Sequence, residues 1–107
     1  MNTSSYINST IIPNNMNDMQ VAMTVIKILC NPNRFAIISL LSGTKKNFCV
    51  GEIAEEVGIS QSLASHHLSY LGARGVVKNI RMGQSMCYIL TTSLITKKIV
   101  EVLKLLK

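Results

Sequence analysis

Apolar residues recur along this chain with the spacing of a helix face in five segments, and extended apolar runs precede the last of them. The spacing predicts helices over about 18–30, 33–41, 50–57, 61–73 and 93–106. Two extended runs, 76–81 and 85–90, are joined by Met82-Gly83-Gln84 and predict a β-hairpin. Residues 48–50 fit either a short strand or an extended lead-in. The pattern therefore predicts a mainly α domain with a small β-hairpin, in the order α-α-α-α-β-β-α.

Two of the expected helices, the first and the last, are too apolar for a helix that buries one stripe. In 18–30 and 93–106 the apolar residues cover most of the circumference, whereas a surface helix has a single apolar face. A helix buried on two sides suits a homodimer. Residues 1–17 are rich in Asn, Ser and Thr and are expected to be a flexible N-terminal arm. Residues 18–107 are expected to form a single domain.

Composition narrows the class of protein. Apolar residues make up 48% and charged residues 15% of 107 residues, which excludes a disordered chain. The formal net charge of +6 favours a polyanion or an acidic membrane surface as partner. No run approaches the roughly 20 apolar residues of a membrane span. The first 17 residues lack the pattern of a signal peptide. We therefore expect a cytoplasmic protein without a membrane partner.

The expected helix over 61–73 has one apolar and one polar face. On a helical wheel the core face comprises Ser60, Ala64, His67, Leu68 and Leu71. The opposite face comprises Ser62, Ser65, His66 and Ser69, with Gln61 at its edge near the N-terminus. Small polar side chains allow close approach to a DNA groove, and Gln can bond an adenine edge at two points. A merely solvated polar face is the alternative, but the tight turn at Gly58 and the basic hairpin that follows favour a DNA-reading helix.

Base contacts and phosphate contacts are expected from different residues. Gln61, Ser62, Ser65 and His66 lie in the first half of the helix, where this motif meets base edges, and Ser69 continues their face. The candidates for the DNA backbone are Lys45 and Lys46 in a basic loop and Lys78, Arg81 and Gln84 on the hairpin. A hairpin tip can reach an adjacent minor groove, so Arg81 is the strongest of these candidates.

Several short motifs together resemble the ArsR/SmtB family of dimeric repressors. They are Asn31-Pro32-Asn33-Arg34-Phe35, Cys49-Val50-Gly51-Glu52-Ile53-Ala54, Ser60-Gln61-Ser62, Ser65-His66-His67-Leu68, Arg81-Met82-Gly83-Gln84 and Tyr88-Ile89-Leu90. The resemblance runs from about residue 19 to the end of the chain. It implies a winged helix-turn-helix fold and a homodimer joined through the first and last helices. It also implies a repressor that binds an inverted-repeat operator in double-stranded DNA and is released by a metal or thiol signal.

The family's usual sensor sites are incomplete here. Its arsenic and cadmium sensors carry Cys-Val-Cys where this chain has Cys49-Val50-Gly51, and the last helix has no His or Asp. A soft metal needs several thiolates, so we expect no bound metal or other cofactor. The redox and sulfide-sensing branch is similar at Val50-Gly51-Glu52-Ile53 and at Ser60-Gln61. Its second-helix cysteine corresponds to Ser39, and the chain end has no cysteine either.

The three cysteines of this chain stand elsewhere. Their odd number, without CxxC spacing, argues against a secreted disulfide scaffold and a closed zinc site. Cys30 is expected to be a small core residue and Cys87 to lie in a strand. Cys49 lies near a helix start and near Lys45 and Lys46, surroundings that favour a reactive thiolate. It is the candidate sensor thiol.

No arrangement of residues indicates an enzyme. The sequence suggests no Ser-His-Asp or Cys-His set and no Gly-rich phosphate loop, and its carboxylates cluster on one solvated helix face. The expected function is a dimeric, sequence-specific DNA-binding repressor released by a thiol-reactive or other signal. Three alternatives remain: a metal-responsive repressor, a winged helix that binds DNA without a sensor, and a winged helix that binds proteins instead of DNA.

Overall fold

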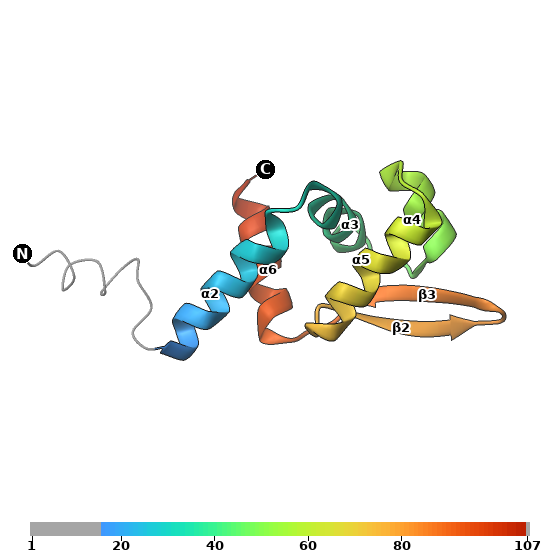
Figure 1. Ribbon diagram of the computed structural model, residues 1–107. Coiled ribbons are helices and arrows are strands. Elements are labelled where there is room, and N and C mark those ends of the chain that lie inside the picture. Colours follow the sequence, from blue (N-terminus) through green and yellow to red (C-terminus); the bar gives the residue numbers. More distant parts are fainter. Residues whose placement is uncertain (1–15, 107) are drawn as a thin grey trace, which may run out of the picture.

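The computed structural model describes residues 16–106, over which five helices accompany a three-stranded antiparallel sheet (Figure 1). The helices are α2 (Met16–Leu29), α3 (Pro32–Ser42), α4 (Val50–Val57), α5 (Gln61–Ala73) and α6 (Leu94–Leu105). The strands are β1 (Phe48–Cys49), β2 (Val77–Met82) and β3 (Ser85–Leu90). The expected order of helices and hairpin is confirmed. The arm expected over residues 1–17 lies outside the described residues, except that Met16 and Asn17 already belong to α2.

Polar side chains cap the N-termini of α3 and α5. The side-chain oxygen of Asn31 accepts hydrogen bonds from the backbone N–H groups of Asn33 and Arg34 at 2.9 and 3.0 Å and so begins α3. Ser60 Oγ accepts from the N–H of Leu63 at 3.1 Å and begins α5. The expectation that Ser60 lies on the core face is wrong. Its side chain is exposed because it caps the helix instead of packing beneath it.

A tight turn joins α4 to α5. Gly58 has φ of 82°, in the left-handed region that favours glycine, and its N–H donates to the carbonyl of Ala54 at 2.8 Å. Only three residues therefore separate the two helices. Ile53 and Ala54 are buried on the inner face of α4, whereas its glutamates are exposed. This geometry makes α4 and α5 a helix-turn-helix pair.

The sheet has the strand order β1-β3-β2, and its hairpin forms the wing. β2 and β3 pair in register from Val77 with Leu90 to Met82 with Ser85, and Gly83 makes the turn with φ of 66°. The hairpin projects beyond the helices (Figure 1). Residues 48–49 form a true strand, β1, which pairs antiparallel with β3. Since α4 follows β1 directly, this pairing attaches the helix-turn-helix to the wing.

The core is apolar and draws on every helix. The largest fully buried side chains are Ile28, Ile37, Ile38, Ile53, Leu68, Leu71, Val76, Cys87 and Ile99. Burying each large aliphatic side chain contributes about 1.5–3 kcal/mol. α6 packs beside α2 at the end of the molecule opposite the tip of the wing (Figure 1). The two ends of the molecule share this one core. We call them the α2–α6 end and the α5–wing end.

A group of hydroxyl side chains ties these two ends together. Ser93 Oγ donates to the carbonyl oxygen of Gly75 at 3.0 Å, and Thr96 Oγ1 donates to that of Val76 at 3.3 Å. Gly75 and Val76 follow α5, whereas Ser93 and Thr96 begin α6. Thr96 is only 3% exposed, so its bond is shielded from water. The last turn of α5 is therefore fixed relative to the first turn of α6.

Across residues 16–106, no helix alone has the length and apolar character to cross a membrane. Only Asp18–Leu29 and Pro32–Ser42 taken together reach that length and composition, and the two are bent by 98°.

His67 is a buried ionisable group in this apolar core. Its side chain is 6% exposed, and Nδ1 has no hydrogen-bond partner. Burial lowers the pKa of His67 below its usual value of 6.5, and the positive charges of Arg34 and His66 lower it further. The imidazole therefore packs in its neutral form.

We expect the free energy of unfolding to fall as the pH drops below 6.5. His67 takes up its proton more readily in the unfolded chain than in the folded one, so the stabilisation is complete above 6.5 and is lost below it. Each unit of pKa difference corresponds to about 1.4 kcal/mol. Urea unfolding at a series of pH values should show a flatter profile for His67→Leu than for wild type. His66→Gln is the control. If the pH dependence of the unfolding free energy stayed as in wild type for His67→Leu but flattened for His66→Gln, the effect would belong to His66 and the prediction would be wrong.

Candidate nucleic-acid interface

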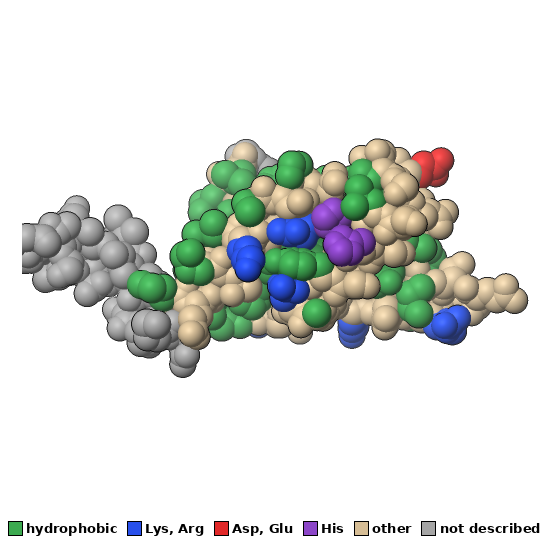
Figure 2. All heavy atoms as spheres, viewed as in Figure 1, with side chains coloured by type: hydrophobic (Ala, Val, Ile, Leu, Met, Phe, Trp, Pro, Cys, Tyr) green, Lys and Arg blue, Asp and Glu red, His purple; other side chains and the backbone are tan. Residues whose placement is uncertain are grey.

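The outer face of α5 is polar and exposed. Gln61, Ser62, Ser65, His66 and Ser69 are all exposed. The inner face is packed: Ala64, Leu68 and Leu71 are fully buried. The predicted orientation of the helix, including His66 outward and His67 inward, is therefore confirmed. In Figure 2 the histidines lie near the middle of this side of the molecule, and acidic side chains appear only at the α4 end.

Gln61 lies against the first turn of α4, a contact that the sequence did not reveal. A Cβ built on Gly51 would lie 3.3 Å from the Gln61 side-chain nitrogen, Nε2. Gly51 therefore leaves room for the amide at the N-terminus of α5, where the first base contact is expected. Its place as the second residue of α4 was readable from the sequence, but the approach of Gln61 depends on the angle between the two helices.

The wing carries the remaining hairpin candidates on exposed positions. Lys78, Arg81 and Gln84 are all exposed, and Gln84 directly follows the glycine turn. Arg81 is opposite Met86 near the tip. α5 packs against β2, so the wing extends from the same part of the molecule as the helix-turn-helix (Figure 1). The structure thus places these three residues on the wing, beside the helix-turn-helix.

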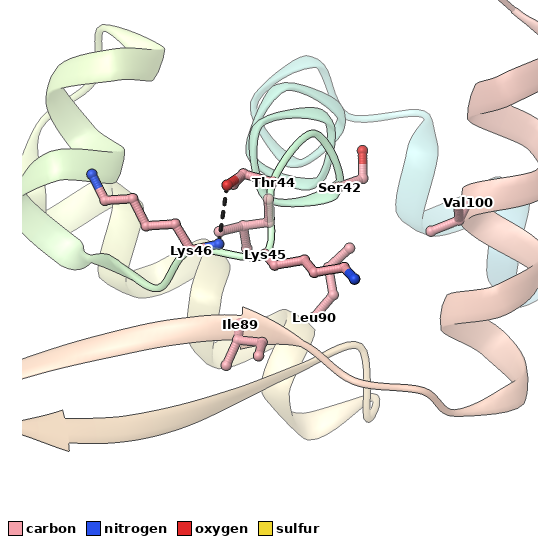
Figure 3. A pocket seen from close by; sticks show the side chains of 8 residues that line it. Ser42, Thr44, Lys45, Lys46, Ile89, Leu90 and Val100 are labelled. Carbon is pink, nitrogen blue, oxygen red and sulfur yellow. Dashed lines mark hydrogen bonds between the residues drawn. The ribbon is translucent and has the colours of Figure 1, made fainter.

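The basic loop presents its two lysines differently. Lys46 lies 3.9 Å from the Glu52 carboxylate and its ammonium lies 5.1 Å from the centre of the Phe48 ring, yet its side chain stays exposed. Such an exposed ion pair is worth little. Lys45 runs in the opposite direction, toward Leu90, while Lys46 turns toward α4 (Figure 3). The loop therefore spreads its charge instead of concentrating it at one point.

A pocket of about 320 Å³ lies beneath Lys45. Leu41, Ile89, Leu90 and Val100 form its apolar part, and Ser42, Thr44, Lys45 and Lys46 form its polar edge (Figure 3). The backbone N–H of Lys46 donates to Thr44 Oγ1 at 3.0 Å and shapes this edge.

A cluster of Arg34, Tyr70 and Arg74, here called the arginine–tyrosine stack, lies at the other end of α5 and was missed by the sequence analysis. Both guanidinium groups lie over the Tyr70 ring. A spacing of four residues, Ser62-His66-Tyr70-Arg74, could have placed Tyr70 and Arg74 on the side of α5 that carries His66. Arg34 could not have been found this way because it comes from α3.

The cysteines differ most from expectation. Cys49, the candidate sensor thiol, is joined to Cys87 by a disulfide, because β1 and β3 place these residues opposite each other. The expectation that Cys30 is a core residue is wrong. Cys30 is exposed as a free thiol just beyond α2, and its Sγ donates to the carbonyl of Lys27 at 3.2 Å. Within residues 16–106, no group of three or more His, Cys, Asp or Glu side chains could hold a metal ion.

The contact between Gly51 and Gln61 generates a test. Gly51→Ala should raise the free energy of unfolding by up to about 1 kcal/mol, since alanine favours a helix and the exposed Gln61 side chain can yield. The same change should displace the Gln61 amide and weaken discrimination between DNA sequences. Urea unfolding and binding competition between duplexes measure the two effects. A stabilised variant with wild-type sequence preference would show that the position of Gln61 does not matter for reading DNA.

This chain is similar in sequence to known bacterial regulatory proteins. The sequence profile described as "Bacterial regulatory protein, arsR family" matches residues 31–79, which span α3 to β2. The nodulation protein NolR of Rhizobium meliloti is 36% identical over 76 residues, which cover 71% of this chain and 61% of that protein. The transcriptional repressor SdpR of Bacillus subtilis is 36% identical over 75 residues, which cover 70% of this chain and 81% of that protein.

A solved structure agrees with the sequence relatives. The crystal structure of NolR from Sinorhizobium fredii superimposes with a TM-score of 0.70 at 31% identity, covering 90% of this chain and 93% of that one. These relatives are regulatory proteins and not enzymes, and the family profile covers the whole helix-turn-helix, α4 and α5. This chain therefore belongs to the arsR family of bacterial regulatory proteins.

Proposed function

We propose that this protein is a homodimeric repressor that inserts α5 into the major groove of an inverted-repeat operator. The observation that carries this proposal is the two-sided α5, whose inner face is buried in the core while its outer face presents hydrogen-bonding groups to solvent. A major groove admits a helix, and small side chains let its backbone approach the base edges. The similarity to the transcriptional repressor SdpR supports repression, and not activation, as the proposed effect. The place of action would be the cytoplasm, because the DNA is there.

Each group on this end of the molecule has a role in the proposal. The base-reading side chains are Gln61, Ser62, Ser65 and His66, followed by Ser69 on the same face. The phosphate-binding groups are Lys45, Lys46, Lys78, Arg81 and Gln84. Gln61 can bond an adenine edge at two points, and a serine hydroxyl can donate or accept. Arg81 and Gln84, near the tip of the wing, can reach the minor groove beside the site.

The second copy is proposed to cover the apolar surface of α2 and α6. Met23 and Ile26 on α2 are 60% and 61% exposed, and Leu105 and Leu106 at the end of α6 are 82% and 65% exposed. The two helices lie side by side, so these side chains belong to one end of the molecule (Figure 1). An exposed apolar surface of this kind favours association. A two-fold axis there would present two copies of α5 to half-sites about one DNA turn, roughly 34 Å, apart.

The double variant Gln61→Ala, His66→Ala tests the reading face. It should lose discrimination between operator and unrelated DNA, since each well-placed base contact is worth about 1–3 kcal/mol. Operator sequences are first selected from random duplexes with the wild-type protein, and competition gel shifts then measure the preference. Light scattering should give the mass of a dimer for both proteins, because the substitutions lie far from α2 and α6. An unchanged sequence preference would refute the assignment of α5, and a monomeric wild type would refute the dimer.

The release signal is proposed to be oxidation of Cys49 and Cys87. Two thiols lose two protons and two electrons to form the disulfide, and hydrogen peroxide accepts them to give two water molecules. The disulfide joins β1, and with it the start of α4, to β3, which is a strand of the wing and the central strand of the sheet. A covalent link at this point restricts movement of the wing relative to the helix-turn-helix. We infer that the reduced protein binds the operator and that the disulfide-bonded form releases it.

Serine variants separate the three thiols. Peroxide or polysulfide should lower the operator affinity of wild type and of Cys30→Ser, and it should leave Cys49→Ser and Cys87→Ser unchanged. Cys30→Ser is the matched control because its thiol is free and exposed. Fluorescence anisotropy before and after oxidation, with thiol counting by mass spectrometry, measures the response. Equal loss of affinity in Cys49→Ser and wild type would remove this disulfide from the release step.

A further inference from the structure

The arginine–tyrosine stack places two positive charges on one aromatic ring at the C-terminal end of α5. The guanidinium carbon of Arg74 lies 3.4 Å from the centre of the Tyr70 ring, and that of Arg34 lies 4.2 Å from it. A cation over an aromatic face gains about 0.5–2 kcal/mol. At these distances from one centre the two guanidinium groups lie on opposite faces of the ring. They concentrate positive charge at this end of α5, which favours an anion nearby.

Hydrogen bonds hold both arginines in position and leave donors free. Arg34 Nε and Nη2 donate to the carbonyl oxygens of Ile28 and Lys27 at 3.1 and 2.9 Å, at the end of α2. Arg74 Nη1 donates to the carbonyl oxygen of Tyr70 at 3.2 Å. Since a guanidinium has five N–H donors, each arginine retains donors for a ligand. Side chains that are already ordered lose less conformational entropy when they bind.

The surroundings of the stack are basic. In Figure 2, Lys and Arg side chains gather directly beside the histidines, while the acidic groups appear only at the far, α4 end of this face. The exposed Lys27 belongs to the same region, since Arg34 bonds to its carbonyl. The planar N–H donors of a guanidinium suit the oxygens of a phosphate.

The stack lies beyond the reading residues along α5. Tyr70 follows His66 by four residues and Arg74 follows Tyr70 by four, and each step turns about 40° around the helix and advances about 6 Å. Arg74 therefore lies about 12 Å beyond His66 along the helix axis. Phosphates border the major groove along its whole length, so a basic group beyond the reading residues can meet one of them.

We propose that the arginine–tyrosine stack binds a phosphate of the DNA backbone and fixes how deeply and at what angle α5 enters the groove. This inference rests on the proposed DNA-binding function and adds an anchor from α3 and α5 to those of the loop and the wing. Phosphate contacts carry no sequence information themselves, but they set the register in which the reading side chains act.

The salt dependence of binding tests this anchor. Arg74→Gln should weaken binding to the selected operator and to a scrambled duplex by a similar factor. The slope of log affinity against log salt should become shallower by about 0.9, the value for one phosphate contact. Between about 50 and 200 mM salt, the ratio of wild-type to variant affinity should therefore shrink about 3.5-fold. Arg74→Lys, which keeps the charge, should recover most of the slope.

Lys104→Gln is the matched control because it removes the same charge from an exposed site in the last turn of α6, at the end away from Gly75 and Val76. It should leave the slope at the wild-type value. A wild-type slope in Arg74→Gln, or a loss confined to the operator duplex, would refute the phosphate contact while leaving DNA binding established. If wild type bound no duplex with salt-dependent affinity, the proposed function itself would fail, so the two failures are distinguishable. Circular dichroism melting confirms that each variant is folded.

Discussion

Burial of the inner face of α5 is the constraint on which the rest of the structure depends. Ala64, Leu68 and Leu71 have no exposed surface, so the helix cannot rotate about its axis without exposing apolar side chains to water. This fixed rotation decides that Ser65 and His66 face outward. The cap at Ser60 and the left-handed turn at Gly58 fix where the helix begins. A surface of small polar groups is useful for reading DNA only when it is held this firmly.

The remaining elements hold α5 between two regions of the molecule whose surfaces differ. The α2–α6 end offers apolar surface, and the wing end offers basic and polar side chains. The hydroxyls of Ser93 and Thr96 connect the end of α5 with the start of α6. The disulfide between Cys49 and Cys87 connects the start of α4 with the wing. Changes at either end can therefore alter the position of α5, which makes the fold suitable for a regulated binding protein.

Much of this arrangement was predictable because it depends on local sequence. The bounds of α4 and α5 followed from apolar spacing and the turn at Gly58, and the wheel placed His66 on the outer face and His67 on the inner face correctly. Local spacing failed where position depends on distant segments. It placed Cys30 in the core, although the residue lies just beyond the end of α2. It also left open whether residues 48–50 form a strand, because strand β1 exists only through pairing with β3.

By itself the sequence determined the order of the elements, the two-faced α5 and the family resemblance, since each is encoded in residues only a few positions apart. The tertiary structure alone decided which distant residues meet. It brought Cys49 to Cys87, Gly51 to Gln61 and Arg34 to the ring of Tyr70. Helical periodicity specifies a direction around one axis, whereas such contacts depend on the angles and register between elements. Those angles and that register are set by how the whole core packs.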